Sequence, residues 1–191
     1  MTDSPRLLAP AAAEFLRVAA GLTDLGARTP CAGYDVRALL NHLLYWGPWL
    51  IAAGERSEPP VPGVTEADAV LVTEDWLPVL DKQAATLVDV FSAPAAWTGT
   101  TALGSASLPA AVVGEMVLGE FVLHGWDLAS ASGQELSCPP DTALAVHAAA
   151  EAMGSQARSM GVYGPLVPIP PDASPLDLAL GASGRDPAWR P

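Results

Sequence analysis

Residues 112–129 read VVGEMVLGEFVLHGWDLA. Their apolar side chains recur at steps of three and four, a spacing that is typical of one face of a helix. The stripe on this face is apolar at its start and polar further on, with the members Val113, Val117, Glu120, His124 and Asp127. We therefore predict a helix from about Pro109 to Ser132, on which a carboxylate and an imidazole lie one turn apart.

The same periodicity and the helix-breaking residues divide the remainder of the chain. Further helices are predicted at about 6–25, from Asp35 past Trp49, from about Thr65 to Phe91 with an interruption at Pro78, and from about Asp141 to Met160. Residues 94–109 suit a loop or a short hairpin that turns near Gly104. The proline-rich stretch 161–175 is expected to lie extended across the helices. The predicted fold is a single all-α domain over residues 1–191: an up-down four-helix bundle with an additional short helix and an extended C-terminal tail.

Composition excludes several classes of protein. The chain has 191 residues and a formal net charge of −12, with nine basic residues and a single lysine, Lys82. It therefore has no basic cluster that could neutralise phosphates, and we expect no nucleic acid partner. No apolar run reaches the roughly 18 residues of a membrane span, and the N-terminus lacks the basic and apolar blocks of a secretory signal. We expect a cytoplasmic protein without a membrane partner.

A metal site is the main functional hypothesis from the residues alone. His42 lies in LLNHLLYW, another strongly helical segment, so two imidazoles and the carboxylate of Glu120 could meet between facing helices. Such a set suits a divalent ion and leaves coordination positions open for water or substrate. Two simpler interpretations stay open. Glu120 and His124 could lie at a rim where the helix meets water, and His42 could be a core histidine that bonds a carbonyl group.

Other candidate residues give weaker indications. Several aromatic side chains are expected in the core, although some could wall a pocket beside the metal; these are Tyr45, Trp46, Trp49 and Trp126. His147 fits a surface or rim position, with a role as a fourth ligand left open. Cys31 and Cys138 are too few for a disulfide scaffold and lack the spacing of a structural zinc site, so each is expected to be a free buried thiol.

Three segments of the chain carry a family resemblance. The first motif is TPCAGYDVRALLNHL at 29–43, the second is EFVLHGWDLASASG at 120–133, and the third is YGPLVPIPPDASPLDLALGASGRDPAW at 163–189. Together and in this order they resemble the DinB-like superfamily, and more closely its branch of mycothiol-dependent maleylpyruvate isomerase metal-binding domains. Tyr34 departs from the first motif, which usually has tryptophan there. The isomerase also has an additional C-terminal domain, which this chain is expected to lack.

The resemblance implies a fold, a ligand set and a chemistry. The fold is an up-down four-helix bundle, with one metal ligand on the second helix and two on the later one, here His42, Glu120 and His124. The ion is expected to be zinc, with nickel or iron as alternatives, and a low-molecular-weight thiol is the expected co-substrate. The resulting hypothesis is a thiol-dependent S-transferase or isomerase, of the mycothiol kind, that acts on a small electrophile.

Some roles and alternatives stay open at this stage. Asp127 is expected to hold a ligand histidine in its tautomer or to act on protons as a catalytic group. Its competing interpretation is a surface carboxylate near the helix end. A non-catalytic protein that binds a metal or a small ligand is the main alternative function. A metal-free bundle whose helices serve to form a homodimer is a third.

Overall fold

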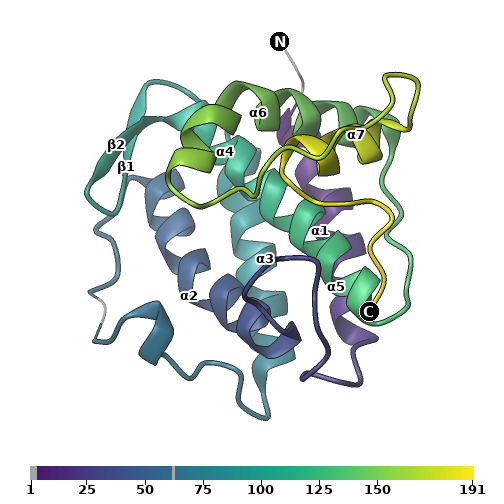
Figure 1. The fold of residues 1–191 in the computed structure, drawn as a ribbon. Coiled ribbons are helices and arrows are strands. Elements are labelled where there is room, and N and C mark those ends of the chain that lie inside the picture. Colours follow the sequence, from purple (N-terminus) through teal and green to yellow (C-terminus); the bar gives the residue numbers. More distant parts are fainter. Residues whose placement is uncertain (1–3, 62) are drawn as a thin grey trace.

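A computed structural model describes residues 4–61 and 63–191 and shows a four-helix bundle (Figure 1). Its helices are α1 (Ser4–Ala20), α2 (Val36–Glu55), α3 (Trp76–Ser92) and a long column of α4 (Ala110–Gly119), a π-helical turn (Glu120–His124) and α5 (Gly125–Ala131). Both α3 and α4 pack against α1 and against α2, so α1 and α2 lie on a diagonal of the bundle. The predicted all-α four-helix bundle is confirmed.

Two further helices and a hairpin complete the fold. α6 (Pro140–Ser159) packs against α1 and α4, and α7 (Pro175–Ala182) lies against α6 at the top of Figure 1. The hairpin joins β1 (Thr100–Leu103) to β2 (Ala106–Pro109) in antiparallel register, with Thr100 opposite Pro109. Gly104 turns the chain with a φ of +60°, which glycine adopts without strain. The predicted hairpin is therefore confirmed.

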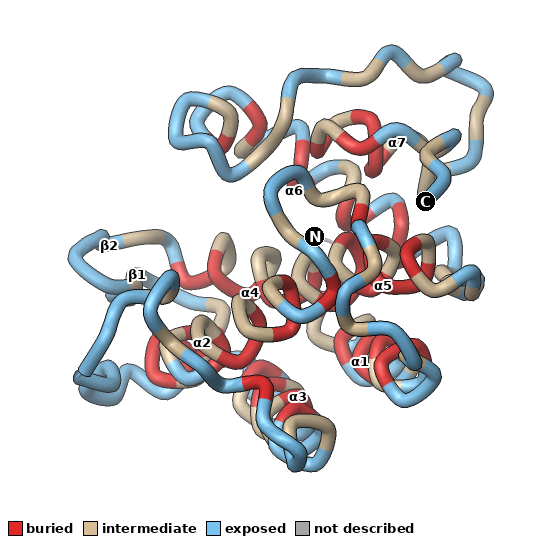
Figure 2. Tube along the Cα trace, turned by 60° about the horizontal axis from the view of Figure 1, so that its bottom comes forward, coloured by how far each residue is buried: buried red, intermediate tan, exposed pale blue. Residues whose placement is uncertain are grey.

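The bundle helices bury their apolar faces against one another (Figure 2). The largest fully buried side chains come from several helices; they include Phe15, Leu39, Leu40, Phe91, Leu118 and Leu128. Among residues 4–61 and 63–191, none of the helices has the length and apolar character needed to cross a bilayer.

The start of α2 agrees with the sequence prediction. The Asp35 carboxylate accepts a hydrogen bond from the backbone N–H of Ala38 at 2.7 Å and caps the first turn. From this start α2 continues through Pro48 to Glu55. His42 therefore lies in the second turn of this helix, close to its capped start.

Two helix boundaries differ from prediction. α1 ends at Ala20 and not near Leu25. The chain turns at Gly21, and a second turn follows in which the Asp24 carboxylate accepts from the N–H of Gly26 at 2.9 Å. The helix predicted from about Thr65 is also wrong. Only the 3-10 turn Glu66–Asp68 forms there, and α3 begins at Trp76. Pro78 lies in the first turn of α3, where its missing N–H costs nothing.

The tail after α6 is only partly as predicted. Residues 161–174 form no helix or strand, as expected, but the chain then enters α7. Ser174 caps this helix by accepting from the N–H of Asp177 at 3.1 Å, and Pro175 occupies the first helical position. α7 was not predicted.

Candidate metal centre

The structure brings together the three side chains that the sequence nominates as metal ligands. His42 comes from α2, and Glu120 and His124 come from the π-helical turn. Oε2 of Glu120 lies 3.8 Å from Nε2 of His42 and 3.6 Å from Nε2 of His124. One ligand atom from each residue lies within 4.8 Å of the other two, a spacing that a single ion could bridge.

The outer nitrogen of each imidazole is held by a carboxylate. His42 Nδ1 lies 2.8 Å from Oε1 of Glu66, and His124 Nδ1 lies 3.0 Å from Oδ2 of Asp127. A hydrogen on Nδ1 makes both of these bonds, and the lone pair of each ring is then on Nε2, facing Glu120. Carboxylates placed in this way behind ligand histidines are the usual outer partners of protein-bound metals.

Glu120 has an unsatisfied acceptor at the centre of this cluster. Its Oε2 is the one buried side-chain nitrogen or oxygen without a hydrogen-bond partner in the described part of the chain. With both imidazoles protonated on Nδ1, three lone pairs face one another and no donor lies between them. Buried acceptors are normally satisfied, so this arrangement is costly on its own. A cation would satisfy all three atoms, and the donor set of two nitrogens and one carboxylate fits a divalent ion.

Asp127 is paired on both sides. Its side chain is 0% exposed, so its interpretation as a surface carboxylate is wrong. Besides His124, it contacts Arg185 from the tail after α7, whose Nε and Nη2 donate to Oδ1 and Oδ2 at 2.9 and 2.8 Å. Burial alone would raise the pKa of Asp127, but the charge of Arg185 and the hydrogen bonds from His124 and Arg185 hold that pKa below its ordinary value.

Glu66 is the other carboxylate and was not nominated from the sequence. Besides His42 it accepts hydrogen bonds from Nε1 of Trp46 at 2.7 Å and from the hydroxyl of Tyr34 at 3.2 Å. Partial burial pushes the pKa of Glu66 up, but the hydrogen bonds from Trp46 and His42 outweigh burial and hold that pKa below its ordinary value. Burial and the charge of Glu66 raise the pKa of Tyr34 to about 12, so Tyr34 stays a donor at neutral pH.

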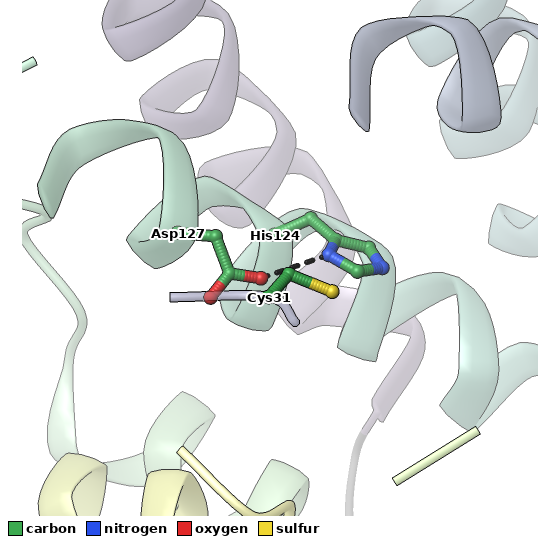
Figure 3. Close-up of side chains that lie close together, drawn as sticks. All are labelled: Cys31, His124 and Asp127. Atoms are coloured by element: carbon green, nitrogen blue, oxygen red, sulfur yellow. Dashed lines mark hydrogen bonds and ion pairs between the residues drawn. The ribbon is translucent and has the colours of Figure 1, made fainter. Parts of the chain in front are cut away.

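Cys31 forms a second group of potential ligands with His124 and Asp127 (Figure 3). This group shares His124 with the first, and both oxygens of its Asp127 already accept from Arg185. Burial, followed by the charge of Asp127, raises the pKa of the Cys31 thiol to about 11. The group around Glu120, with three free ligand atoms, is therefore the better metal site. Both cysteines are free and partly buried.

The remaining candidate residues lie at different distances from this centre. Trp46 lines a narrow cavity that reaches Glu120 and is otherwise walled mainly by apolar side chains of α1, α2 and α3. Tyr45 instead donates its hydroxyl to the Val64 carbonyl at 3.2 Å, and Trp126 packs against the hydrophobic core. His147 belongs to neither ligand group found among the described residues; its Nε2 lies 3.7 Å from a carboxylate oxygen of Glu151.

Sequence reasoning missed Glu66 and Arg185. Neither follows a helical or strand spacing that connects it to the ligands. Arg185 does lie in the third motif, which was the only signal available for it.

Comparison with known proteins agrees with the fold and with the family resemblance. Residues 8–129 match the family of the mycothiol maleylpyruvate isomerase N-terminal domain. The uncharacterised protein Rv0738 of Mycobacterium tuberculosis (strain ATCC 25618 / H37Rv) is 29% identical over an alignment of 169 residues that covers 85% of each chain. The uncharacterised protein MT0763 of strain CDC 1551 / Oshkosh matches to the same extent.

Solved structures show the same fold. The crystal structure of the mycothiol-dependent maleylpyruvate isomerase superposes with a TM-score of 0.68 at 17% identity and covers 97% of this chain. A point mutant of a mycothiol-dependent maleylpyruvate isomerase gives a TM-score of 0.67 at 16% identity over 96% of this chain. The first match covers 90% of the isomerase chain.

Proposed function

Because the chain belongs to the mycothiol maleylpyruvate isomerase N-terminal domain family, we propose that it is a metal-dependent enzyme that uses a small thiol of the mycothiol kind. Its substrate would be a small electrophile, transformed by isomerisation or by S-transfer. The observation that carries the proposal is the unpartnered Oε2 of Glu120 between Nε2 of His42 and Nε2 of His124. We expect zinc at these three residues, with nickel or iron as alternatives.

A divalent ion held there would supply a thiolate at neutral pH, because coordination lowers the pKa of a thiol. The three protein ligands leave positions free for an external sulfur. Glu66 and Asp127 hold the two imidazoles with their Nε2 lone pairs towards Glu120. In this proposal Asp127 acts through His124 and does not touch the substrate, since it is fully buried behind the ring.

The two cysteines of the chain are poorly suited to act as the nucleophile, which supports the use of a small-molecule thiol. Burial is the main cause that raises the pKa of both Cys31 and Cys138 to about 11, so both are protonated at neutral pH. A protonated thiol is a poor nucleophile. The sulfur that attacks the electrophile would therefore come from a small molecule. The proposal includes a cytoplasmic location, where small thiols are kept reduced.

Trp46 is our candidate for the wall of the thiol or substrate pocket, because it lines the cavity beside Glu120 and also bonds Glu66. Tyr45 and Trp126 are two of the other aromatic residues considered for that wall, and they make no polar contact with the three proposed ligands in the described part of the chain. We therefore expect Trp46→Phe to change thiol binding more than Trp126→Phe does.

The test begins with elemental analysis of protein purified without a histidine tag. One equivalent of a divalent metal is expected in the wild type and in the control variant His147→Ala, and none in His42→Ala. Thiol addition should then change the visible spectrum of the Co²⁺-substituted protein, and turnover should appear with a panel of electrophiles that includes maleylpyruvate. Metal without a thiol response or turnover would favour a non-catalytic binding protein. Absence of stoichiometric metal would refute the proposal.

A further inference from the structure

We propose that Glu66, on the loop between α2 and α3, is a positioning residue of the metal centre that fixes the tautomer of His42 and balances the charge of a divalent ion. This inference rests on the proposed metal site, and it does not depend on the thiol chemistry. Glu66 lies 24 residues from His42 in sequence, on a 3-10 turn that contributes no buried residue to the core.

The contacts of Glu66 determine which nitrogen of His42 carries the hydrogen. Its Oε2 accepts from Nε1 of Trp46 at 2.7 Å, and its Oε1 accepts from the Tyr34 hydroxyl at 3.2 Å. A carboxylate that accepts from both of these donors is an acceptor for His42 as well, so His42 donates from Nδ1. The lone pair of His42 is then on Nε2, which faces Glu120.

Side chains of α2 hold the loop so that Glu66 has a defined position. Arg37, Asn41 and Tyr45 lie at successive steps of four on one face of this helix. Arg37 donates to the Val72 carbonyl at 3.3 Å, and Tyr45 donates to the Val64 carbonyl at 3.2 Å. Asn41 bonds two points of the loop. Its Oδ1 accepts from the N–H of Leu71 at 2.8 Å, and its amide N–H donates to the Glu66 carbonyl at 3.4 Å.

The charges around the centre distinguish Glu66 from Asp127. Asp127 is neutralised by Arg185, which donates to both of its oxygens. The partners that we find for Glu66 in the described chain are the neutral donors Trp46 and Tyr34 and the ligand His42. Among His42, Glu66, Glu120, His124 and Asp127, the two carboxylates without an arginine or lysine side chain beside them are therefore Glu66 and Glu120. Their combined charge of −2 would balance one divalent cation. Loss of the charge on Glu66 should weaken binding of the ion.

The test compares Glu66→Gln with Asp68→Asn, which removes a carboxylate from the same turn. Asp68 is exposed and accepts only from the Thr65 hydroxyl among its described contacts, so this variant controls for long-range charge. Zn²⁺ affinity is measured by competition with a chelator, and unfolding is measured by circular dichroism. We expect Glu66→Gln to bind Zn²⁺ about 10- to 100-fold more weakly at unchanged helicity, and Asp68→Asn to stay within about threefold of the wild type. Equal losses in the two variants would overturn the inference.

A second measurement needs no bound ion. Nitrogen-15 NMR of the metal-free wild type reports which ring nitrogen of His42 is protonated. We expect the hydrogen on Nδ1 in the wild type and in Asp68→Asn, and a mixture of tautomers in Glu66→Gln. A hydrogen on Nε2 in the wild type would overturn the inference whatever the metal content. If the wild type has the Nδ1 tautomer but binds no metal, the proposed function and the charge-balancing role of Glu66 fail, while its effect on the His42 tautomer stands.

Discussion

Replacing Arg185 by methionine should strongly destabilise the metal-free protein. The Arg185 side chain is 7% exposed, and it donates hydrogen bonds to both oxygens of the fully buried Asp127 at 2.8–3.1 Å. It also donates to the Ser183 hydroxyl at 3.2 Å. Methionine fills much of the same space but leaves Asp127 with His124 as its remaining partner. The substitution therefore leaves a buried carboxylate without a compensating charge.

The size of the effect follows from that buried charge. Removing one partner of a buried ion pair costs about 3–5 kcal/mol, against a total free energy of unfolding of about 5–15 kcal/mol for a domain. Combining Arg185→Met with Asp127→Asn removes both charges and keeps an oxygen that can accept from His124. Relative to the wild type, the double variant should lose only about 1–3 kcal/mol of its free energy of unfolding, which is the cost of an imperfectly paired buried amide. The double variant should therefore be more stable than the single Arg185→Met variant.

Urea unfolding followed by far-ultraviolet circular dichroism, with a chelator present, measures these free energies. Arg190→Met is the matched control, because Arg190 is exposed and donates to backbone carbonyls of the same tail. Its cost should stay within about 0.5 kcal/mol. The reasoning fails if Arg185→Met costs less than about 1 kcal/mol, or if the double variant is no more stable than the single one.

Three further outcomes are expected. His124→Ala should lose stoichiometric metal in elemental analysis and keep its helical circular dichroism, as should chelation of the wild type; complete unfolding on chelation would show a structural site instead. Because the folded-state pKa of Asp127 lies below the value of about 3.9 for an unfolded aspartate, its pairing stabilises the fold above about pH 4 and loses that contribution as the pH falls through the folded-state pKa. Urea unfolding between pH 7 and 2.5 should show a fall in stability that is smaller in Asp127→Asn, and equal falls would contradict this. Gly184→Ala should lower the free energy of unfolding by more than about 2 kcal/mol, because φ is +83° and a Cβ would lie 2.6 Å from the backbone of Gly164. The control Gly104→Ala, with a φ of +60° and open space around the Cβ, should lower it by about 1 kcal/mol. Similar losses in the two variants in thermal unfolding would argue against the close approach of Gly184 to Gly164.

Local signals allowed much of the fold to be predicted. A few neighbouring residues encode the capping aspartate of α2, the hairpin around Gly104 and the start of α6 at its two prolines. The start of α3 was wrong for a tertiary reason. Residues around Glu66 and Leu71 find hydrogen-bond partners in the side chain of Asn41, so the chain there gains more from contacts with α2 than from a helix of its own.

The candidate site also has a part that the sequence predicts and a part that only tertiary packing determines. Glu120 and His124 are four residues apart, so their shared face is visible in the sequence, and the π-helical turn that contains them keeps them adjacent. Segments with π-helical geometry are frequent at functional sites. Glu66 and Arg185 reach the site from a loop and a tail, 24 residues from His42 and 58 from Asp127. Tertiary packing determines such contacts, and no spacing rule within one element predicts them.

The geometry also connects the three motifs, far apart in the chain, in which the sequence resembles its family. The first motif contains His42, the second contains Glu120, His124 and Asp127, and the third contains Arg185. In the structure these residues form one chain of contacts, from His42 across Glu120 to His124, and from there through Asp127 to Arg185. The tail thus contacts the candidate site through a buried charge, because Arg185 neutralises the carboxylate that bonds His124, a proposed metal ligand. A change in the tail should therefore alter metal affinity even though the tail supplies no ligand.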